Sequence, residues 1–334
     1  MNTYARNEEV IIYITNHYCR NFMVRVLITG TTGFIGGHLR DLLLEKGYEV
    51  YSLERYVAGR IGKVDPYIKD VYFADLRDIF AITKAINDIK PDIVIHLAAM
   101  TAVAYSYAHP QETIETNFLG TVNLAEVCTK CSSIKQFIFA SSAEVYGISP
   151  EKIKKETDNN LIPNTPYAVS KYAAETYLNY LYKAYNFPIT IFRPFNSYGR
   201  LNDTWFVVEK TIIQMLKQDI CKLGDPNPIR DFVYLKDQLD AYTFAIENEK
   251  TIGETFNIAT GRGVSIKELA DLIAKKTNFS GKIEWDTMPA RPLDILHLIG
   301  SNEKILNTLK IPEFTSLEKG LDLTIKFWRE KLDD

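Results

Sequence analysis

A short apolar strand that runs into three glycines constrains this chain more than any other feature. Residues Val24–Thr29 are followed by Gly30, Gly33 and Gly36, in the spacing G-x-x-G-x-x-G. A glycine turn between a buried strand and a helix lets the backbone approach a pyrophosphate closely, and the helix N-terminus directs free N–H groups at that charge. The usual dinucleotide-binding pattern has one residue fewer between its first two glycines, so the loop alone leaves a plain strand-to-helix turn open.

Short runs of β-branched residues alternate with helical patterns from Met23 onward. This alternation is typical of βαβ units, and it predicts an α/β fold with a Rossmann-type doubly wound parallel sheet of about seven strands. The predicted strands are Val24–Thr29, Glu49–Leu53, Val71–Phe73, Asp92–Leu97, Gln136–Ala140, Ile189–Phe192 and Thr255–Ile258. A helix predicted over Ile35–Lys46, ended by Gly47, connects the first two.

The same pattern divides the chain into three parts. Residues 1–22 show no periodicity and precede the first strand, so we interpret them as an N-terminal extension or a misplaced start. Residues 23–192, with segments near 231–261 that return to the same sheet, are predicted to form a dinucleotide-binding domain. Residues 193–230 and 262–334 are predicted to form a smaller, interleaved C-terminal lobe that binds the substrate.

The composition, with 46% hydrophobic and 24% charged residues, is that of an ordinary globular protein. A formal net charge of −3, with Lys and Arg scattered along the chain, gives no electrostatic reason to expect nucleic acid. No stretch approaches the roughly 20 apolar residues that span a bilayer, so we predict a cytoplasmic protein without a membrane partner. Cys128 and Cys131 lack a second pair, which favours ordinary packing over a metal site.

Acidic residues follow the second and third predicted strands, where the adenosine of a dinucleotide would lie. Glu54 can accept hydrogen bonds from a ribose and therefore favours NAD, whereas Arg55 beside it could pair with a 2′-phosphate and leaves NADP open. Asp75 could contact the adenine, or it could be the N-cap of a helix that starts at Leu76.

The fourth predicted strand ends in His96, Leu97, Ala98 and Ala99. Ligands in open parallel sheets bind at the carboxyl ends of the strands, and the two alanines leave room for a cofactor there. Because His96 lies within an apolar run, a core histidine with satisfied hydrogen bonds is favoured over a catalytic one.

Tyr167 and Lys171 lie on one face of a long predicted helix, which has Thr165 as its N-cap and Pro166 at its first position. A tyrosine acts as a base near neutral pH only if its phenolate is stabilised by roughly 4 kcal/mol, which an adjacent ammonium and a positively charged nicotinamide ring could supply. The fifth strand runs into Ser141–Gly147, which brings hydroxyls and a carboxylate to the same sheet edge.

Together these motifs resemble the extended short-chain dehydrogenase/reductase family, in particular its NAD-dependent nucleotide-sugar epimerases and dehydratases, such as UDP-glucose 4-epimerase-like proteins. The resemblance runs from Met23 to about Leu332. It is carried by Thr29–Gly36, Ala98–Ala99, Thr116–Thr121, Ser141–Gly147, Tyr167–Lys171 and Arg193–Gly199. This combination is highly specific for the superfamily and much less specific for the substrate.

The resemblance implies a role for each matching residue. Tyr167 resembles the family's catalytic base, Lys171 its partner that also holds the nicotinamide ribose, and Ser142 the hydroxyl that hydrogen-bonds the reacting sugar oxygen. The implied contacts with NAD are Gly30, Gly33, Phe34, Ile35, Gly36, Glu54, Asp75, Leu76, Ala98, Ala99, Asn117, Tyr167 and Lys171.

For the reaction, the resemblance implies oxidation of the sugar at C4 to a transient 4-keto sugar while Tyr167 takes the hydroxyl proton, and internal hydride return that gives the 4-epimer. Glu144 keeps a 4,6-dehydratase open, because family dehydratases use a Glu at this position to remove the C5 proton. The preceding residue is Ala143, where many dehydratases have an Asp acid. We therefore favour the epimerase, with the dehydratase as the alternative, ahead of a reductase, a decarboxylase or a non-catalytic NAD(H) sensor.

Nucleotide-sugar contacts are implied in the second half of the chain. Asn196 is similar to a residue that contacts the diphosphate, and Arg230 lies in a segment that resembles the family's nucleotide-binding turn. Arg291 and Asp294 resemble an Arg that binds the pyrophosphate and an acid that holds the ribose, although Leu293 replaces the usual glycine between them. A planar guanidinium suits this task because it can meet phosphate oxygens bidentately.

Two helical regions, Gln111–Cys131 and Tyr167–Tyr185, resemble the pair through which family members form a four-helix bundle with a second subunit. We therefore expect a homodimer. The alternative is that their apolar faces only pack on the sheet.

Overall fold

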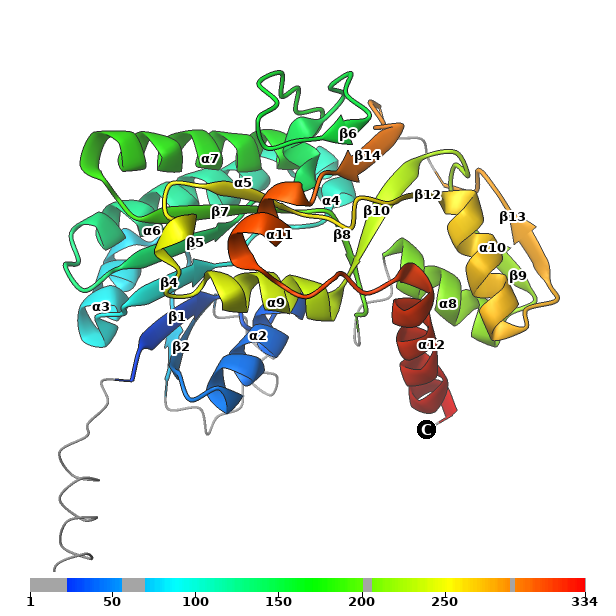
Figure 1. Ribbon diagram of the computed structural model, residues 1–334, viewed down its shortest axis with the longest axis horizontal. Coiled ribbons are helices and arrows are strands. Elements are labelled where there is room, and N and C mark those ends of the chain that lie inside the picture. The colour runs from blue at the N-terminus through cyan, green and yellow to red at the C-terminus, as the bar shows by residue number, and fades with distance from the viewer. Residues whose placement is uncertain (1–22, 56–69, 201–205, 289–291, 334) are drawn as a thin grey trace, which may run out of the picture.

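The computed structural model describes residues 23–55, 70–200, 206–288 and 292–333. It contains a seven-stranded sheet, a second sheet of five short strands and a two-stranded sheet. Figure 1 shows the large sheet and its helices on one side of the molecule, and the smaller sheets with their helices on the other. The predicted extension over residues 1–22 lies outside the described residues.

The large sheet is parallel throughout, in the order β11-β7-β5-β4-β1-β2-β3. Its strands are β1 (Arg25–Thr29), β2 (Glu49–Glu54), β3 (Val71–Phe73), β4 (Ile93–His96), β5 (Gln136–Ala140), β7 (Ile189–Pro194) and β11 (Thr255–Ile258). These are the strands predicted from the sequence, with ends that differ by at most two residues. The predicted Rossmann-type doubly wound sheet is therefore confirmed.

Helices cover both faces of this sheet, which is why its strands read as nearly continuous apolar runs. In β1, Val26 and Ile28 face one hydrophobic cluster and Leu27 faces the other. The first cluster is covered by α2 (Phe34–Glu45), α9 (Leu235–Ala245) and α11 (Glu303–Leu309). The second is covered by α3 (Ile79–Ile89), α6 (Gly120–Thr129) and α7 (Pro166–Tyr185).

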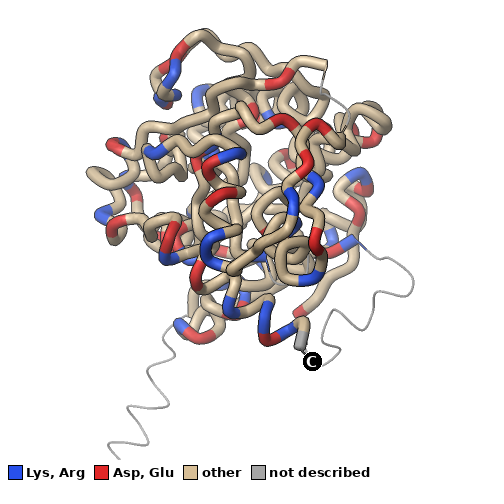
Figure 2. The backbone as a smooth tube through the Cα atoms, turned by 90° about the vertical axis from the view of Figure 1, so that its right-hand side faces the viewer, with Lys and Arg blue, Asp and Glu red and all other residues tan. Residues whose placement is uncertain are grey.

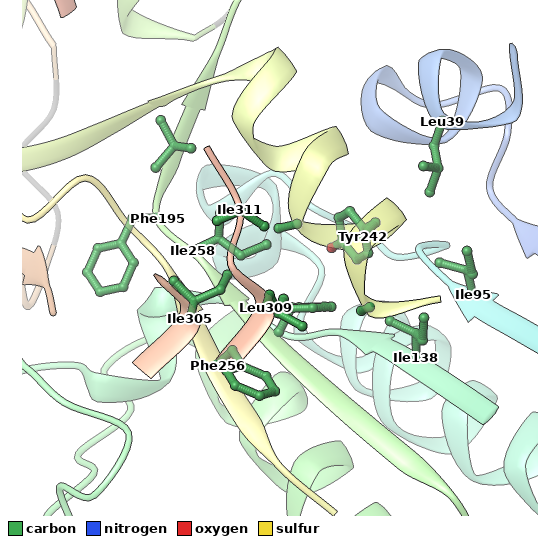
Figure 3. Packing of buried hydrophobic residues seen from close by; sticks show 14 of the residues in the cluster. Leu39, Ile95, Ile138, Phe195, Tyr242, Phe256, Ile258, Ile305, Leu309 and Ile311 are labelled. Carbon is green, nitrogen blue, oxygen red and sulfur yellow. The ribbon is translucent and has the colours of Figure 1, made fainter. Parts of the chain in front are cut away.

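Figure 3 shows the packing of the first cluster. Side chains from the covering helices, among them Leu39 of α2 and Tyr242 of α9, lie with Ile95 and Ile138 of the sheet in one buried cluster. Several of these side chains are fully buried, so the helices are fixed on the sheet by close packing.

The second sheet has the order β12-β10-β14-β6, with β8 paired to β10. The strands of the two smaller sheets are β6 (Ile153–Lys154), β8 (Asn196–Tyr198), β9 (Ile220–Lys222), β10 (Ile229–Tyr234), β12 (Gly263–Ser265), β13 (Lys282–Glu284) and β14 (His297–Gly300). A third hydrophobic cluster packs β8, β9, β10, β12 and β13 against α8 (Val207–Lys217), α10 (Ile266–Thr277) and α12 (Leu317–Asp333).

The remaining elements are short. They are α4 (Val103–Ala108), α5 (Pro110–Ile114), η2 (Glu115–Leu119), η3 (Ala143–Tyr146) and η4 (Glu249–Thr251). The chain leaves the large sheet after β7, forms β10 with Phe232 in the second sheet, and returns to the large sheet at β11. The division into the three predicted parts stays a prediction.

Two helix starts test the capping expectations. Thr165 is the N-cap of α7 and its hydroxyl accepts a hydrogen bond from the Ala168 amide (2.9 Å), as predicted. The interpretation of Asp75 as an N-cap is wrong, because Asp78 caps α3. The Asp75 carboxylate instead accepts hydrogen bonds from the guanidinium of Arg77, 2.8 Å between Nη2 and Oδ2.

No helix in the described ranges has the length and apolar character needed to cross a bilayer. The cytoplasmic location stays a prediction. Cys128 is buried in the second cluster and Cys131 packs at its edge, so ordinary packing of this pair is confirmed. Figure 2 shows basic and acidic positions interspersed along the chain on the face in view.

Candidate active site

The carboxyl ends of four neighbouring strands bring most of the predicted site residues to one edge of the sheet. The register pairs Thr29 with His96, His96 with Phe139, and Ala140 with Phe192 across β1, β4, β5 and β7. The glycine loop, the two alanines and the two serines follow directly after the first three of these strands. Open parallel sheets bind ligands at this edge.

The glycine loop brings β1, β4 and α2 unusually close together. Gly30 has φ +82°, and a Cβ at this position would lie 2.9 Å from the Cα of Ala98. A Cβ at Gly36 would lie 2.2 Å from the carbonyl oxygen of Gly30. The N-cap of α2 is Gly33, which has no side chain to bond the first amides of the helix. The loop thus combines close backbone approach with uncapped amides, which suits a pyrophosphate.

The Glu54 carboxylate holds this loop from the end of β2. It accepts hydrogen bonds from the hydroxyls of Thr31 and Thr32 (both 2.8 Å) and from the two backbone amides of the same residues. A ribose bound here would contact the same Glu54 carboxylate that already orders the loop. The predicted contact between Glu54 and the ribose stays a prediction. Arg55 forms an ion pair with Glu112, 3.7 Å between Nη1 and Oε1, so its guanidinium faces a carboxylate.

Asn117 joins the loop after β4 to α7. Its Oδ1 accepts a hydrogen bond from the Met100 amide (2.7 Å), and its Nδ2 donates to the Met100 carbonyl (3.1 Å) and the Ser170 hydroxyl (3.0 Å). Leu76 is buried and packs against Gly120. These contacts order the walls of the site, and direct contact of Asn117 and Leu76 with NAD stays a prediction.

Lys171 projects from α7 to the end of β5. Its Nζ donates a hydrogen bond to the Ala140 carbonyl (2.7 Å) and lies 4.8 Å from the centre of the Phe139 ring. Burial lowers the pKa of Lys171 to about 7, although the Glu175 carboxylate opposes this shift. A buried ammonium of this kind is sensitive to every charge around it.

Tyr167, Ser142 and Glu144 lie together beside Lys171, so the structure brings the four predicted catalytic residues to one place. Burial raises the pKa of Tyr167 to about 12, a hydrogen bond with Ser142 opposes the shift, and the Glu144 carboxylate adds to it. The Ser142 hydroxyl also accepts a hydrogen bond from the Glu144 amide (3.2 Å). Burial and the Glu144 charge together outweigh the Ser142 hydrogen bond and favour the phenol, so a Tyr167 base at neutral pH requires additional positive charge.

Two buried polar atoms at this edge have no hydrogen-bond partner among the described residues. They are Ser141 Oγ, just after β5, and Asn196 Oδ1, just after β7. Buried polar atoms are nearly always paired, because an unpaired one costs about 1–3 kcal/mol. A ligand at the sheet edge would supply the missing partners.

The predicted substrate residues of the second half are brought together in part. Arg230 Nη2 donates to Asp294 Oδ1 (3.1 Å), and Arg230 Nη1 donates to the Ile295 carbonyl (2.6 Å). The two residues thus contact each other, and their contacts with a nucleotide stay predictions. Arg291 lies outside the described residues.

Residues 27–324 match the family model described as GDP-mannose 4,6 dehydratase. The chain belongs to this family. It is therefore an NAD-dependent epimerase/dehydratase of the extended short-chain dehydrogenase/reductase type, as the motifs predict, and these proteins are enzymes.

The relatives of this chain are named for several different activities. A Methanocaldococcus jannaschii protein provisionally named UDP-glucose 4-epimerase is 35% identical over 266 residues, covering 78% of this chain and 85% of the relative. A UDP-N-acetyl-alpha-D-glucosaminuronate decarboxylase of Bacillus cytotoxicus is 32% identical, covering 93% and 99%. The family is therefore fixed, and the reaction within it is not.

Two solved structures share the fold. The Thermotoga maritima UDP-glucose 4-epimerase, solved with UDP-glucose, superposes with a TM-score of 0.84 at 30% identity, covering 92% of this chain and 100% of that one. The Thermus thermophilus UDP-glucose 4-epimerase, solved with NAD, superposes with a TM-score of 0.82 at 29% identity, covering 92% and 99%. NAD is the cofactor of this protein, and the glycine loop with its uncapped amides fits NAD.

Sequence reasoning missed one charged pair next to this site. Glu175 lies one turn beyond Lys171 on α7, and its carboxylate binds the Arg193 guanidinium of β7 through Nε (3.0 Å) and Nη2 (2.7 Å). The available signal was the spacing of four residues that continues from Tyr167 through Lys171 to Glu175.

His96 is a core histidine, as predicted. Its Nδ1 lies 2.7 Å from the Thr29 hydroxyl and its Nε2 lies 2.9 Å from the Thr121 hydroxyl. The Thr121 hydroxyl donates to the Asn117 carbonyl (2.6 Å), so Nε2 of His96 is the donor and Nδ1 accepts from Thr29. Burial, followed by the charge of Lys171, lowers the pKa of His96 to about 3.

This burial predicts a loss of stability in acid. An unfolded histidine with a pKa of 6.5 binds a proton as the pH falls toward 3, whereas folded His96 does not. The free energy of unfolding therefore falls as the pH falls through this window, by up to about 1.4 kcal/mol per pH unit, and is unaffected above it. Urea unfolding of the wild type and of His96→Gln should show a weaker pH dependence in the variant, and identical slopes would contradict the assignment.

Proposed function

We propose that this protein is an NAD-dependent nucleotide-sugar 4-epimerase that acts through a transient 4-keto sugar. The observation that supports it most is the convergence of Ser142, Tyr167 and Lys171 at the sheet edge, beside a cradle that fits NAD. NAD supplies the chemistry of accepting a hydride from C4 and returning it to either face of the ketone.

The protein groups handle the proton and the position of the sugar. Tyr167 takes the proton of the 4-hydroxyl and later returns it, while the Ser142 hydroxyl holds the same oxygen. Lys171 supplies positive charge that favours the Tyr167 phenolate, and the positive nicotinamide ring adds to it. Asn196 and Arg230 are the proposed contacts for the diphosphate and nucleotide, with Arg291 and Asp294 for the pyrophosphate and ribose.

A 4,6-dehydratase is the alternative because Glu144 faces Tyr167 closely enough for its charge to raise the tyrosine pKa. Such a reaction needs Glu144 to remove the C5 proton and an acid to protonate the departing 6-hydroxyl. The neighbouring residue, Ala143, is 2% exposed and cannot donate a proton. We therefore place the epimerase first, ahead of a reductase, a decarboxylase or a non-catalytic NAD(H) sensor.

The product identifies the reaction. The purified protein is incubated with UDP-, dTDP- and GDP-hexoses without added NAD(P)H, and the products are read by NMR. We expect a C4 epimer of one of these sugars and no net change in NADH. A 6-deoxy-4-keto product would establish the dehydratase instead, and turnover that requires added NAD(P)H would establish a reductase.

Tyr167→Phe tests the proposed base in the same assay. It should lower kcat by about 100-fold or more, because positioned acid–base catalysis contributes at least this much. Tyr185→Phe is the matched control, since this tyrosine lies at the other end of α7 and is 64% exposed. Near-normal turnover by Tyr167→Phe would remove this residue as the base.

We further propose that the protein forms a homodimer through the outer face of α7 and the neighbouring η2. An open apolar groove on this face is lined by Phe118, Val169, Tyr172, Ala173, Thr176, Tyr177 and Tyr180. Figure 1 shows α7 along the upper edge of the part of the molecule that contains the large sheet. Exposed apolar patches of this kind mark interaction surfaces, and a two-fold axis would place the same helices of a second copy against them.

Light scattering tests the dimer. Wild-type protein should have the mass of two chains, and Tyr180→Glu should shift it toward one, because a charge would be buried in the contact. Phe80→Glu is the control, since Phe80 is 85% exposed on α3, far from the groove residues in the sequence. A Tyr180→Glu mass equal to that of the wild type would contradict this interface.

A further inference from the structure

A line of buried ionisable side chains continues along α7 beneath the proposed base. Tyr167, Lys171 and Glu175 are spaced by four residues, so they lie on one face of the helix, and all three are buried. Arg193 of β7 ends the line and is 6% exposed. Its two hydrogen bonds to Glu175 join α7 to β7. The Lys171 ammonium binds the last residue of β5, the strand next to β7.

The buried Glu175–Arg193 ion pair contributes little net stability to the contact between α7 and β7. Both charges have lost their hydration, and a buried pair is often no more stabilising than apolar residues of the same size. Apolar side chains already hold α7 to the sheet on either side of the pair, among them Ala174 and Leu178. We therefore expect the Glu175–Arg193 pair to do more than hold α7 on the sheet.

The charged groups around Lys171 point to that role. On α7, Tyr167 and Glu175 lie one turn before and one turn after Lys171, and the Glu175 charge acts on it. The Lys171 charge in turn acts on His96 of β4, and Arg193 of β7 binds Glu175. His96 is neutral at physiological pH, and Glu175 is the carboxylate whose charge favours the Lys171 ammonium against the cost of burial. When Lys171 is protonated, Lys171, Glu175 and Arg193 together carry one net positive charge, which a Tyr167 phenolate would balance.

We propose that Glu175, held by Arg193, is a positioning residue that keeps Lys171 positively charged beside Tyr167. Glu175 acts through Lys171, and its carboxylate is bound by the Arg193 guanidinium. Arg193 has a second effect, because its positive charge limits how strongly Glu175 attracts Lys171. The consequence for catalysis rests on the proposed function, whereas the effect on Lys171 itself does not.

The titration of Lys171 tests this directly. Protein labelled with 13C at the lysine ε-carbons is titrated by NMR, and the Lys171 signal is assigned by its absence in Lys171→Arg. In Glu175→Gln the Lys171 pKa should fall by about one unit or more, since an opposite charge within reach shifts a pKa by about 1–3 units. In Arg193→Gln it should rise, because Glu175 is then unopposed.

The opposite directions separate this role from simple attachment. If the pair only fastens α7 to β7, both variants lower the melting temperature and leave the Lys171 titration where it was, and that result would overturn the proposal. Because a lone buried charge can prevent folding, the double variant Glu175→Gln, Arg193→Gln keeps two amides in place of the pair. Its Lys171 pKa should lie below that of the wild type, and an unchanged value would likewise overturn the proposal.

The pH dependence of turnover gives a second readout. In Glu175→Gln the acid limb of kcat should move to higher pH with KM unchanged, because a neutral Lys171 no longer favours the Tyr167 phenolate. If the wild type shows no turnover of any nucleotide sugar, the proposed function fails, and the Lys171 titration still decides the role of Glu175.

Discussion

The fold depends on one close backbone contact, between the start of α2 and the carbonyl of Gly30. A Cβ at Gly36 would stand 2.2 Å from that oxygen, so glycine is required for the helix to begin so close to the strand. From this start α2 runs back along the sheet and buries Leu39 and Leu43 in the first cluster. The same contact leaves the helix N-terminus at the carboxyl edge of β1, where the other parallel strands also end.

The shared edge explains why residues far apart in the sequence form one site. Ser142 follows β5, Asn196 follows β7, and Tyr167 and Lys171 reach the end of β5 from the helix between them. Its electrostatics are those of a dry site, because burial governs the pKa of both Tyr167 and Lys171. In the proposed reaction, Tyr167 can accept a proton near neutral pH only when Lys171 and the nicotinamide ring supply positive charge beside it.

The sequence predicted the parallel sheet well because its strands are short runs of β-branched and aromatic residues that alternate with helical patterns. It could not predict the second sheet, whose strands are as short as two residues and come from segments far apart in the chain. The sequence left Asp75 open as a helix cap, whereas in the structure Asp78 caps α3 and the Asp75 carboxylate is bound by Arg77. Glu54 binds the glycine loop, and Arg230 pairs with Asp294. These contacts join residues far apart in the sequence, so the sequence alone could not predict them.

In the proposed reaction, C4 of the sugar is oxidised and reduced again within the same site. The most direct measurement follows a deuterium placed at C4 of the nucleotide sugar that the protein turns over, in ordinary water. We expect the C4 epimer with the deuterium still at C4, read by NMR, and no label in the solvent. Protium at C4 of the product, or deuterium moved to C6 of a 6-deoxy-4-keto sugar, would contradict the proposed epimerase reaction.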